Sequence, residues 1–382
     1  MQTVGILGGG QLARMLVLAG APLGVRFLVV DQVEDACAGQ IAPLICADWR
    51  DFDALEKFAQ QVDVATFDFE NVPADTAQWL TERTKVFPNP RALSTAQDRL
   101  AEKTLFRECG LDTPAFAKVD TREDLDAALR EVGAPAILKT RRLGYDGKGQ
   151  FRLRSIADAD AAWQALGANA HGLILEAFVP FECEVSVVAG RGRDGEFRTW
   201  PLTRNWHSDG ILSASLAPAD IDPKLQTHAF ELARVIAEKL DYVGVFALEL
   251  FVHQGKLLGN EMAPRVHNSG HWTIEGALTS QFENHVRAVL GLPLGDTAAL
   301  GRSCMLNWIG ELPDRDAILR ESDAHWHDYG KSPRVGRKVG HATLRARDDR
   351  SLAAALERVG AALRRQDQVE PVIRALHGRT ED

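Results

Sequence analysis

The chain has 382 residues, 45% of them hydrophobic, and a formal net charge of −9, which is enough sequence for two to four domains at roughly 100–200 residues each. The acidic balance argues against a nucleic-acid-binding protein, which would present a basic face. No stretch approaches the roughly 18 consecutive apolar residues of a membrane span, and no secretion signal precedes the first strand-like run. The five cysteines are scattered and fit neither a disulfide framework nor a zinc site. We therefore expect a cytoplasmic protein with reduced thiols and with no nucleic-acid or membrane partner.

Residues 3–90 alternate short apolar runs with helical patterns, which predicts a parallel, doubly wound α/β sheet. We place this first domain at 1–92, because the turn Phe87–Pro90 breaks the pattern. One continuous helix is expected from Arg91 to Cys109, with Gly110 as its C-cap.

The pattern changes after this helix, and we expect a second domain at 93–292. A small α+β unit is predicted at about 115–180, and a larger unit with a long helix follows at about 181–292. Pro293 marks the next boundary. The remaining segment, 293–382, is predicted to form a small domain with strands, a basic loop and a helix with an apolar stripe.

The glycine-rich turn GGGQLA at 8–13 connects a predicted strand to a helix. Glycines there let the backbone approach an anion at the helix N-terminus. The turn matches the dinucleotide pattern, and Asp31 ends the next strand, where a ribose-binding acid would lie. Taken alone it predicts NAD, so an NAD-binding dehydrogenase is one alternative, although loops of this kind serve many phosphate ligands.

Two acids in strand-like segments are the strongest sign of a metal site. Glu249 lies within the apolar run VGVFALELFV, and Glu261 follows in what reads as the neighbouring strand. A buried acid costs several kcal/mol unless it is paired or bound to a metal. Two such acids suit magnesium held against nucleotide phosphates. The alternative is pairing with a buried Lys or Arg; Asn260 and the polar run after it favour the metal.

Several loops carry groups that could bind a nucleotide. Lys139 ends a predicted strand and precedes a glycine-rich loop whose N–H groups could cover phosphates, although a flexible hairpin tip is the alternative. Two basic clusters contain glycines and lie between predicted strands, which favours anion-binding loops over a solvated surface. These clusters are Arg141, Arg142 and Lys148, and Lys331, Arg334, Arg337 and Lys338.

An apolar linker, EAFVPFECE at 176–184, is typical of segments that hold an adenine ring, with Glu184 placed to bind a ribose hydroxyl; an ordinary linker is the alternative. His207 carries modest weight, since a lone histidine is more often structural. Glu70 ends a strand of the first domain, at the edge where doubly wound sheets bind ligands.

In this order, the motifs resemble the ATP-grasp superfamily. DRLAEK, GYDGKGQ, NWHSDGIL, NEMAPRVHNSGHWT and GRKVGH resemble in particular those members that carboxylate an aminoimidazole ribonucleotide in purine biosynthesis. The resemblance spans essentially the whole chain. It departs at GGGQLAR, where relatives often have GQLGR, which weakens the phosphate assignment of this turn.

The resemblance implies an ATP-grasp fold with an N-terminal doubly wound domain and a small C-terminal domain. It implies an ATP-dependent carbon–nitrogen ligase that converts bicarbonate to carboxyphosphate and then carboxylates 5-aminoimidazole ribonucleotide. It also implies Mg²⁺, a glycine-rich loop at 144–150 that closes as a lid, and a homodimer. Alternatives within the superfamily are a formate-dependent glycinamide ribonucleotide transformylase and a biotin carboxylase.

The same resemblance implies the site residues. The ATP site would comprise Arg99, Lys139, Gly144, Tyr145, Asp146, Gly147, Lys148, Gly149, Gln150, Glu176, Ala177, Phe178, Val179, Glu184, His207, Asn260 and Glu261. The ribonucleotide site would comprise Gln11, Leu12, Glu70, Tyr145, Asp146, Arg265, His267, Asn268, Ser269, Lys331, Arg337 and Lys338. The metal ligands would be Glu249 and Glu261. Arg265 would steady carboxyphosphate, and His267 with Asp146 would handle the proton of the attacking amine.

Overall fold

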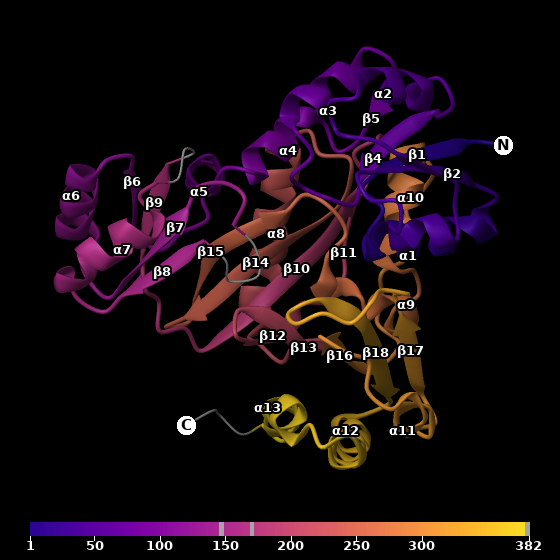
Figure 1. Ribbon diagram of the computed structural model, residues 1–382. Helices are drawn as coiled ribbons and strands as arrows, with labels where there is room; N and C mark the ends of the chain where they lie inside the picture. The colour runs from indigo at the N-terminus through magenta and orange to yellow at the C-terminus, as the bar shows by residue number, and fades with distance from the viewer. Residues whose placement is uncertain (145–148, 169–171, 379–382) are drawn as a thin grey trace.

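The computed structural model describes residues 1–144, 149–168 and 172–378 (Figure 1). The N-terminal part forms a parallel sheet of order β3-β2-β1-β4-β5, which confirms the predicted doubly wound α/β unit. Its strands are β1 (Thr3–Leu7), β2 (Arg26–Asp31), β3 (Leu44–Cys46), β4 (Val64–Phe67) and β5 (Lys85–Val86). Its helices are α1 (Gln11–Gly20), α2 (Phe52–Ala59) and α3 (Ala74–Thr81), with short 3₁₀ turns η1 (Ala21–Leu23) and η2 (Cys37–Gln40).

The single helix predicted over 91–109 is wrong. The structure has two helices, α4 (Pro90–Ala96) and α5 (Arg99–Glu108). Asp98 separates them, because its extended backbone makes it the N-cap of α5 and its side chain accepts from the Leu100 N–H. The break directs the first turn of α5 toward the candidate site.

A second, smaller sheet has the order β6-β9-β7-β8 and is antiparallel throughout. Its strands are β6 (Phe116–Val119), β7 (Ala136–Thr140), β8 (Gln150–Leu153) and β9 (Leu173–Ala177). Helices α6 (Arg122–Val132) and α7 (Ala159–Leu166) cover one face, with the 3₁₀ turn η3 (Ile156–Asp158) before α7. Thr121 and Asp124 form a capping box that fixes the start of α6.

The largest sheet is antiparallel and runs β15-β14-β10-β12-β13-β16-β18-β17, with β11 beside β10. Its strands are β10 (Cys183–Arg191), β11 (Phe197–Thr199), β12 (Thr203–Ser208), β13 (Ile211–Ala217), β14 (Gly244–His253), β15 (Lys256–Ala263), β16 (Arg302–Ile309), β17 (Ala324–Asp328) and β18 (Lys338–Ala346). The sheet crosses the boundary predicted near residue 293, because β13 pairs with β16. The domain limits themselves stay a prediction.

Helices pack on both faces of this sheet (Figure 1). They are α8 (Pro223–Lys239), α9 (Thr273–Gly276), α10 (Gln281–Leu290), α11 (Arg315–Leu319), α12 (Asp349–Leu363) and α13 (Gln366–Leu376), with the 3₁₀ turn η4 (Asn268–Gly270) before α9. Among the described residues, no helix combines the length and apolar character needed to cross a membrane.

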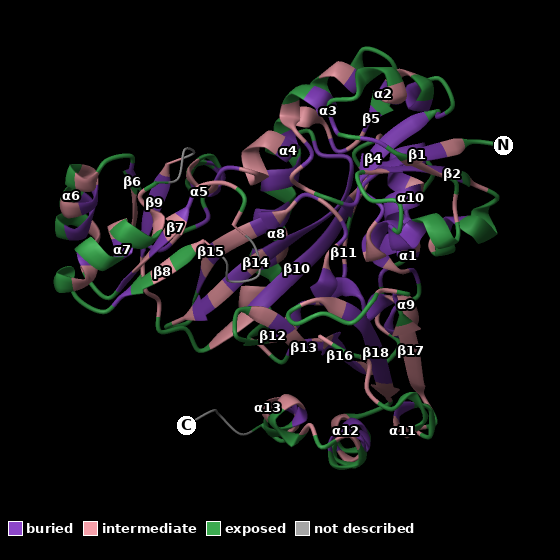
Figure 2. Cartoon of the chain, viewed as in Figure 1, coloured by how far each residue is buried: buried purple, intermediate pink, exposed green. Residues whose placement is uncertain are grey.

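Helix α10 joins the N-terminal sheet to the large sheet, and buried residues run through this junction (Figure 2). His285 on α10 accepts from the Val245 N–H at Nδ1 (3.0 Å), so the ring proton is on Nε2, which contacts Thr66 Oγ1 of β4 (2.7 Å). Burial lowers the pKa of His285 to about 4, so it stays neutral. The junction is therefore held by packing and directed hydrogen bonds.

Candidate active site

The acid pair predicted on neighbouring strands is present. Strands β14 and β15 are antiparallel and Glu249 lies directly opposite Glu261, a register that brings the two Cβ atoms to about 5 Å. Burial and the charge of Glu261 raise the pKa of Glu249 to about 8. Two adjacent carboxylates that repel each other in a buried place form a site that a divalent cation would neutralise.

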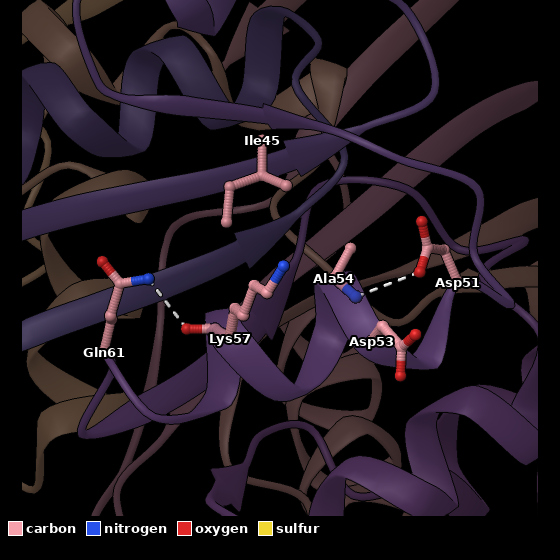
Figure 3. Close-up of a pocket in the computed structure, with 6 residues that line it drawn as sticks. All are labelled: Ile45, Asp51, Asp53, Ala54, Lys57 and Gln61. Carbon is pink, nitrogen blue, oxygen red and sulfur yellow. Dashed lines mark hydrogen bonds between the residues drawn. The ribbon is translucent and has the colours of Figure 1, made fainter.

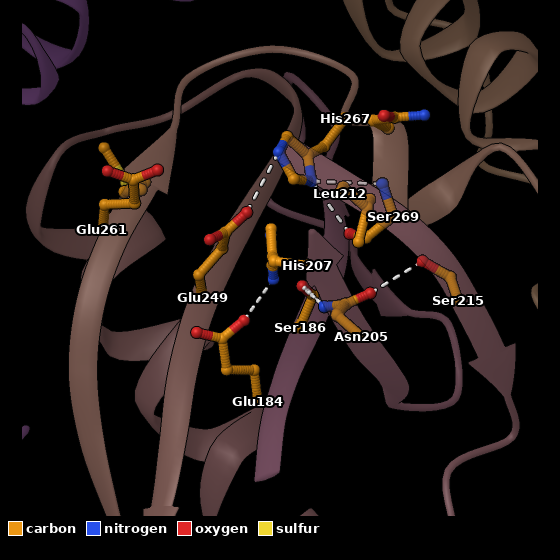
Figure 4. Close-up of polar contacts among 12 residues, drawn as sticks. Glu184, Ser186, Asn205, His207, Leu212, Ser215, Glu249, Glu261, His267 and Ser269 are labelled. Atoms are coloured by element: carbon orange, nitrogen blue, oxygen red, sulfur yellow. Dashed lines mark hydrogen bonds and ion pairs between the residues drawn. The ribbon is translucent and has the colours of Figure 1, made fainter. Parts of the chain in front are cut away.

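The two acids have different protein partners, of which Figure 4 shows that of Glu249. Glu261 forms an ion pair with Arg99 at 2.9 Å. Glu249 contacts His267 Nε2 at 3.1 Å, and burial together with the charge of Arg265 holds the pKa of His267 well below its usual range. Of the two alternatives for a buried acid, pairing with a cationic side chain holds for Glu261, whereas Glu249 contacts a neutral imidazole. Among the described residues, no group of three or more His, Cys, Asp and Glu side chains is arranged to hold a metal, so phosphate or water oxygens would have to complete the coordination.

The turn after β15 carries the other predicted catalytic residues. The Ser269 N–H donates to His267 Nδ1 (3.3 Å) and the Ser269 hydroxyl lies 2.8 Å from the same nitrogen. The ring proton is therefore on Nε2, facing Glu249. Arg265 donates from Nε to Glu70 of the N-terminal domain and from Nη1 to its neighbour's carbonyl at Val266 (3.0 Å). Four predicted residues from two domains thus converge beside the acid pair.

A buried charge cluster lies where the small sheet faces β15. Glu176 Oε2 accepts from Lys139 Nζ at 2.9 Å and pairs with Lys103 Nζ at 3.3 Å. Although burial opposes ionisation, Lys103 and Lys139 hold the pKa of Glu176 at about 2. Lys103 Nζ also donates to the Asn260 carbonyl (3.0 Å). This arrangement places Lys139 at the end of β7, within reach of a nucleotide between the two sheets.

Two residues of the DRLAEK motif were missed as site residues, although the motif itself was a usable signal. Lys103 is fully buried, and Glu102 accepts from the Met262 N–H at 2.6 Å. Burial and the charge of Glu261 raise the pKa of Glu102 to about 8. The first turn of α5 therefore binds three consecutive residues of β15, Asn260 to Met262.

The predicted ribose acid Glu184 forms an ion pair with His207 (Figure 4). Burial disfavours the imidazolium, but Glu184 raises the pKa of His207 above its ordinary value. Beneath this pair, Asn205 donates to Ser186 Oγ (2.6 Å) and accepts from the Ser215 hydroxyl (2.8 Å). Ser186 and Ser215 lie outside the sequence motifs, whereas Asn205 begins the motif NWHSDGIL but was not predicted as a site residue.

The glycine turn of the first domain is closed by its own carboxylates. Asp31 accepts from the Gly9 N–H (2.5 Å) and the Val33 N–H (3.0 Å), so both of its oxygens serve the turn rather than a dinucleotide ribose. Asp68 accepts from the Ala13 N–H at 2.9 Å, and burial raises its pKa to about 6. One of the free N–H groups at the start of α1, that of Ala13, is therefore already bound to a carboxylate.

Two of the remaining predicted substrate residues, Gln11 and Lys331, meet at this turn. Gln11 accepts from Lys331 Nζ of the segment between β17 and β18, so the basic segment faces α1. Leu12 is buried in the hydrophobic core, which leaves only its backbone for a ligand. Arg337 donates to the Ser332 carbonyl (3.2 Å), and Lys338 begins β18.

Two arginines of the first basic cluster are paired within the chain. Arg141 donates from Nε (3.1 Å) and Nη2 (2.7 Å) to Asp98, and Arg142 Nε lies 3.3 Å from the same carboxylate. The Arg141 guanidinium is thus held by a bidentate pair, and the anion-binding role of this loop stays a prediction. Tyr145, Asp146, Gly147 and Lys148 lie outside the described residues.

Several predicted ATP-site residues are placed by backbone geometry. Gly149 has φ +71°, and a Cβ there would meet Thr140 Oγ1 at 2.6 Å, so glycine is needed where β8 begins. Gly144 follows Leu143, and its carbonyl lies 3.5 Å from Arg99 Nη2. The other predicted ATP-site residues in this region are Gln150 at the start of β8, Ala177 at the end of β9, and Phe178 and Val179 directly after β9.

A separate pocket of about 400 Å³ lies beside α2, away from the acid pair (Figure 3). Two of its acids belong to the helix itself: Asp51 caps α2 by accepting from the Ala54 N–H, and Asp53 is in its first turn. Gln61 donates to the Lys57 carbonyl at 2.8 Å. Asp51 and Gln61 thus form hydrogen bonds near the two ends of α2.

Fold and site together define an ATP-grasp enzyme, an ATP-dependent ligase. Residues 104–282 match the ATP-grasp domain, 1–97 the ribonucleotide synthetase preATP-grasp domain, and 303–355 the phosphoribosylaminoimidazole carboxylase C-terminal domain. A protein of Pseudomonas aeruginosa, an N5-carboxyaminoimidazole ribonucleotide synthase, is 51% identical over 94% of this chain and 99% of its own length. The chain belongs to the N5-carboxyaminoimidazole ribonucleotide synthase family.

Solved structures agree with this assignment. The N5-carboxyaminoimidazole ribonucleotide synthetase of Thermus thermophilus matches with a TM-score of 0.90 and 53% identity, over 94% of this chain and 98% of that one. The Aspergillus clavatus N5-carboxyaminoimidazole synthase, in complex with ADP and 5-aminoimidazole ribonucleotide, matches with a TM-score of 0.85 and 29% identity, over 99% of both chains. The family match sets aside the formate-dependent, biotin carboxylase and dehydrogenase alternatives.

Proposed function

We propose that the protein carboxylates 5-aminoimidazole ribonucleotide in purine biosynthesis, using ATP and bicarbonate and releasing ADP and phosphate. The names of its relatives suggest the substrates. For this chain, the proposal rests on one structural observation. The opposed acids Glu249 and Glu261 lie beside the turn that carries Arg265 and His267. Glu70, from the doubly wound domain, meets Arg265 there.

ATP would lie between the small sheet and the large sheet. Lys139 would reach its phosphates from β7 while Glu176 holds the ammonium in place. Glu184, held by His207, would accept from the ribose. Phosphoryl transfer needs positioning and charge neutralisation more than covalent help, and these side chains supply positioning.

Glu249 and Glu261 fit magnesium, because two hard oxygen donors lie in register and the pKa of Glu249 is raised by burial and by its neighbour. When bound, the ion would neutralise charge on the transferring phosphoryl group. Arg99 compensates the charge of Glu261 from the other side. The carboxylates thus define where the phosphates must lie.

Bicarbonate would take the terminal phosphoryl group to give carboxyphosphate, which Arg265 would steady. Its breakdown would give carbon dioxide and phosphate, and the exocyclic amine would add to the carbon dioxide. His267 is neutral with its ring proton on Nε2, so Nδ1, beside the Ser269 hydroxyl, is the nitrogen that would accept the proton that the amine loses; we propose Asp146 as its partner. Lys331, Arg337 and Lys338 would bind the ribonucleotide phosphate.

The test is ADP release measured with and without bicarbonate and the ribonucleotide. We expect rapid release only when both are present with Mg²⁺. Formate and glycinamide ribonucleotide serve as the matched control pair and should give background release. Release that ignores the aminoimidazole ribonucleotide would contradict the proposal.

We further propose a homodimer, which rests on the family resemblance. Light scattering coupled to size-exclusion chromatography should give twice the 41.9 kDa chain mass. A monomer at micromolar concentration would contradict it.

A further inference from the structure

The turn that carries His267 is anchored by two buried amides from distant parts of the chain. One is Gln281, the first residue of α10, and the other is Asn307 in β16. Both side chains are fully buried. Neither belongs to a motif that the sequence associates with ATP, bicarbonate or the ribonucleotide.

Gln281 binds the backbone of His267 at two points. The His267 N–H donates to Gln281 Oε1 at 2.9 Å, and Gln281 Nε2 donates to the His267 carbonyl at 2.6 Å. Two antiparallel hydrogen bonds to one residue fix both its position and its rotation. Gln281 Nε2 also lies 3.2 Å from His271 Nδ1, and burial keeps the pKa of His271 well below its usual range, so that nitrogen can accept.

The turn fits closely around this glutamine. A Cβ added at Gly270 would come within 2.7 Å of Gln281 Cδ and Oε1. The Gln281 N–H donates to Thr273 Oγ1 (3.0 Å), and the Thr273 hydroxyl donates to the Gly270 carbonyl (2.6 Å). The start of α10 and the turn thus form one hydrogen-bonded unit.

Asn307 holds the next residue from the opposite side. Asn268 Nδ2 donates to Asn307 Oδ1 at 3.1 Å, and Asn307 Nδ2 donates back to Asn268 Oδ1 at 2.7 Å. Asn307 Nδ2 also donates to the Leu212 carbonyl at 2.8 Å. The Asn268 amide, predicted to bind substrate, is therefore engaged in a reciprocal pair.

We propose that Gln281 and Asn307 are positioning residues that hold the His267 turn in register with the acid pair. With the His267 backbone held by Gln281 and the Asn268 side chain held by Asn307, the imidazole has Nδ1 on Ser269 and Nε2 on Glu249 (Figure 4). The inference rests on the proposed function, because the part of His267 in turnover is itself proposed.

The first test compares Gln281→Met with a matched control. Asn284→Leu also removes a fully buried side-chain amide of α10 that exchanges two hydrogen bonds with one backbone residue, Gly295 (3.1 Å and 2.7 Å), but both bonds are to the segment after α10 rather than to the turn. We expect kcat to fall about 10- to 100-fold for Gln281→Met, the loss typical of a reacting group displaced by about 1 Å. KM for ATP should stay within about twofold, since Lys139 and Glu176 are not contacted. Asn284→Leu should keep kcat within about twofold.

The second test is a double-mutant cycle with His267→Ala. If Gln281 acts through His267, Gln281→Met should change kcat little once the imidazole is gone. Losses that multiply would overturn the inference, as would a full-rate Gln281→Met enzyme. Asn307→Leu gives an independent second cycle in case Gln281→Met does not fold.

A crystal structure of Gln281→Met supplies a readout that needs no activity. His267 Nε2 should have left Glu249 Oε1; an unmoved ring in a slow variant would overturn the inference. Failure of the proposed function is distinct, because it would show as wild-type enzyme that releases no ADP in response to the ribonucleotide.

Discussion

Replacing Glu249 with glutamine is expected to stabilise the ligand-free protein while abolishing turnover. In the folded chain, burial and Glu261 raise the pKa of Glu249 from 4.5 to about 8. Between these values the unfolded chain ionises Glu249 while the folded chain keeps it protonated, so the free energy of unfolding falls as pH rises. At pH 7 this amounts to a destabilisation on the order of 3 kcal/mol, at about 1.4 kcal/mol per pH unit.

The variant Glu249→Gln removes this linkage and keeps an acceptor for His267. Its thermal midpoint, measured by circular dichroism without Mg²⁺ or nucleotide, should exceed that of the wild type at pH 7, and the gain should shrink below about 1 kcal/mol at pH 5. ADP release with all substrates should be lost, because one of the two proposed metal ligands is gone.

Glu176→Gln is the matched control, with the opposite sign. Lys103 and Lys139 hold the pKa of Glu176 at about 2 despite its burial. The ionised carboxylate therefore stabilises the fold at pH values above its ordinary pKa of 4.5, and this stabilisation is lost as the pH falls toward 2. Its replacement should cost on the order of 3 kcal/mol at pH 7. A Glu249→Gln midpoint below that of the wild type at pH 7, or a gain equal at pH 5 and pH 7, would refute the reasoning.

Three further outcomes follow from the site. Lys139→Met should raise KM for ATP at least about tenfold, since a charge-assisted contact to phosphate is lost, and steady-state ADP release measures it; an unchanged KM would contradict the assignment. Lys331→Ala should raise KM for the ribonucleotide about tenfold and leave KM for ATP unchanged. If the contact is ionic, the difference in KM for the ribonucleotide between the variant and the wild type should become smaller at high salt. Chelation with EDTA should abolish ADP release, and added Mg²⁺ should restore it; full activity in EDTA would exclude the proposed role of the acid pair.

The acid pair was predictable from sequence because it depends on local pattern. An acid in the middle of VGVFALELFV is costly wherever that strand lies, and a second acid one short turn later must fall on the adjacent strand. The facing register of Glu249 and Glu261 confirms that interpretation. The doubly wound first domain was predictable for the same reason, since its strands and helices alternate along the chain.

The partners of these residues were not predictable, because they come from contacts between distant segments. Gln281 and Asn307 look like ordinary polar residues until α10 and β16 are placed against the turn. The break at Asp98 was missed because the apolar pattern continues across it. The available signal was Asp98, a helix-capping acid directly before Arg99. The bidentate pair between Asp98 and Arg141 is a tertiary contact.

The continuity of the large sheet limits how the protein can be divided. Strand β13 is an interior strand only because β16 pairs with it, and Leu216 of β13 packs in one core with Leu306 and Leu344. A fragment ending before Arg302 would leave β13 with a free row of N–H and C=O groups and an uncovered apolar face. Such an edge recruits strands from other chains. The C-terminal strands therefore shield the nucleotide-binding sheet from self-association, and an isolated ATP-grasp fragment is a poor choice for study.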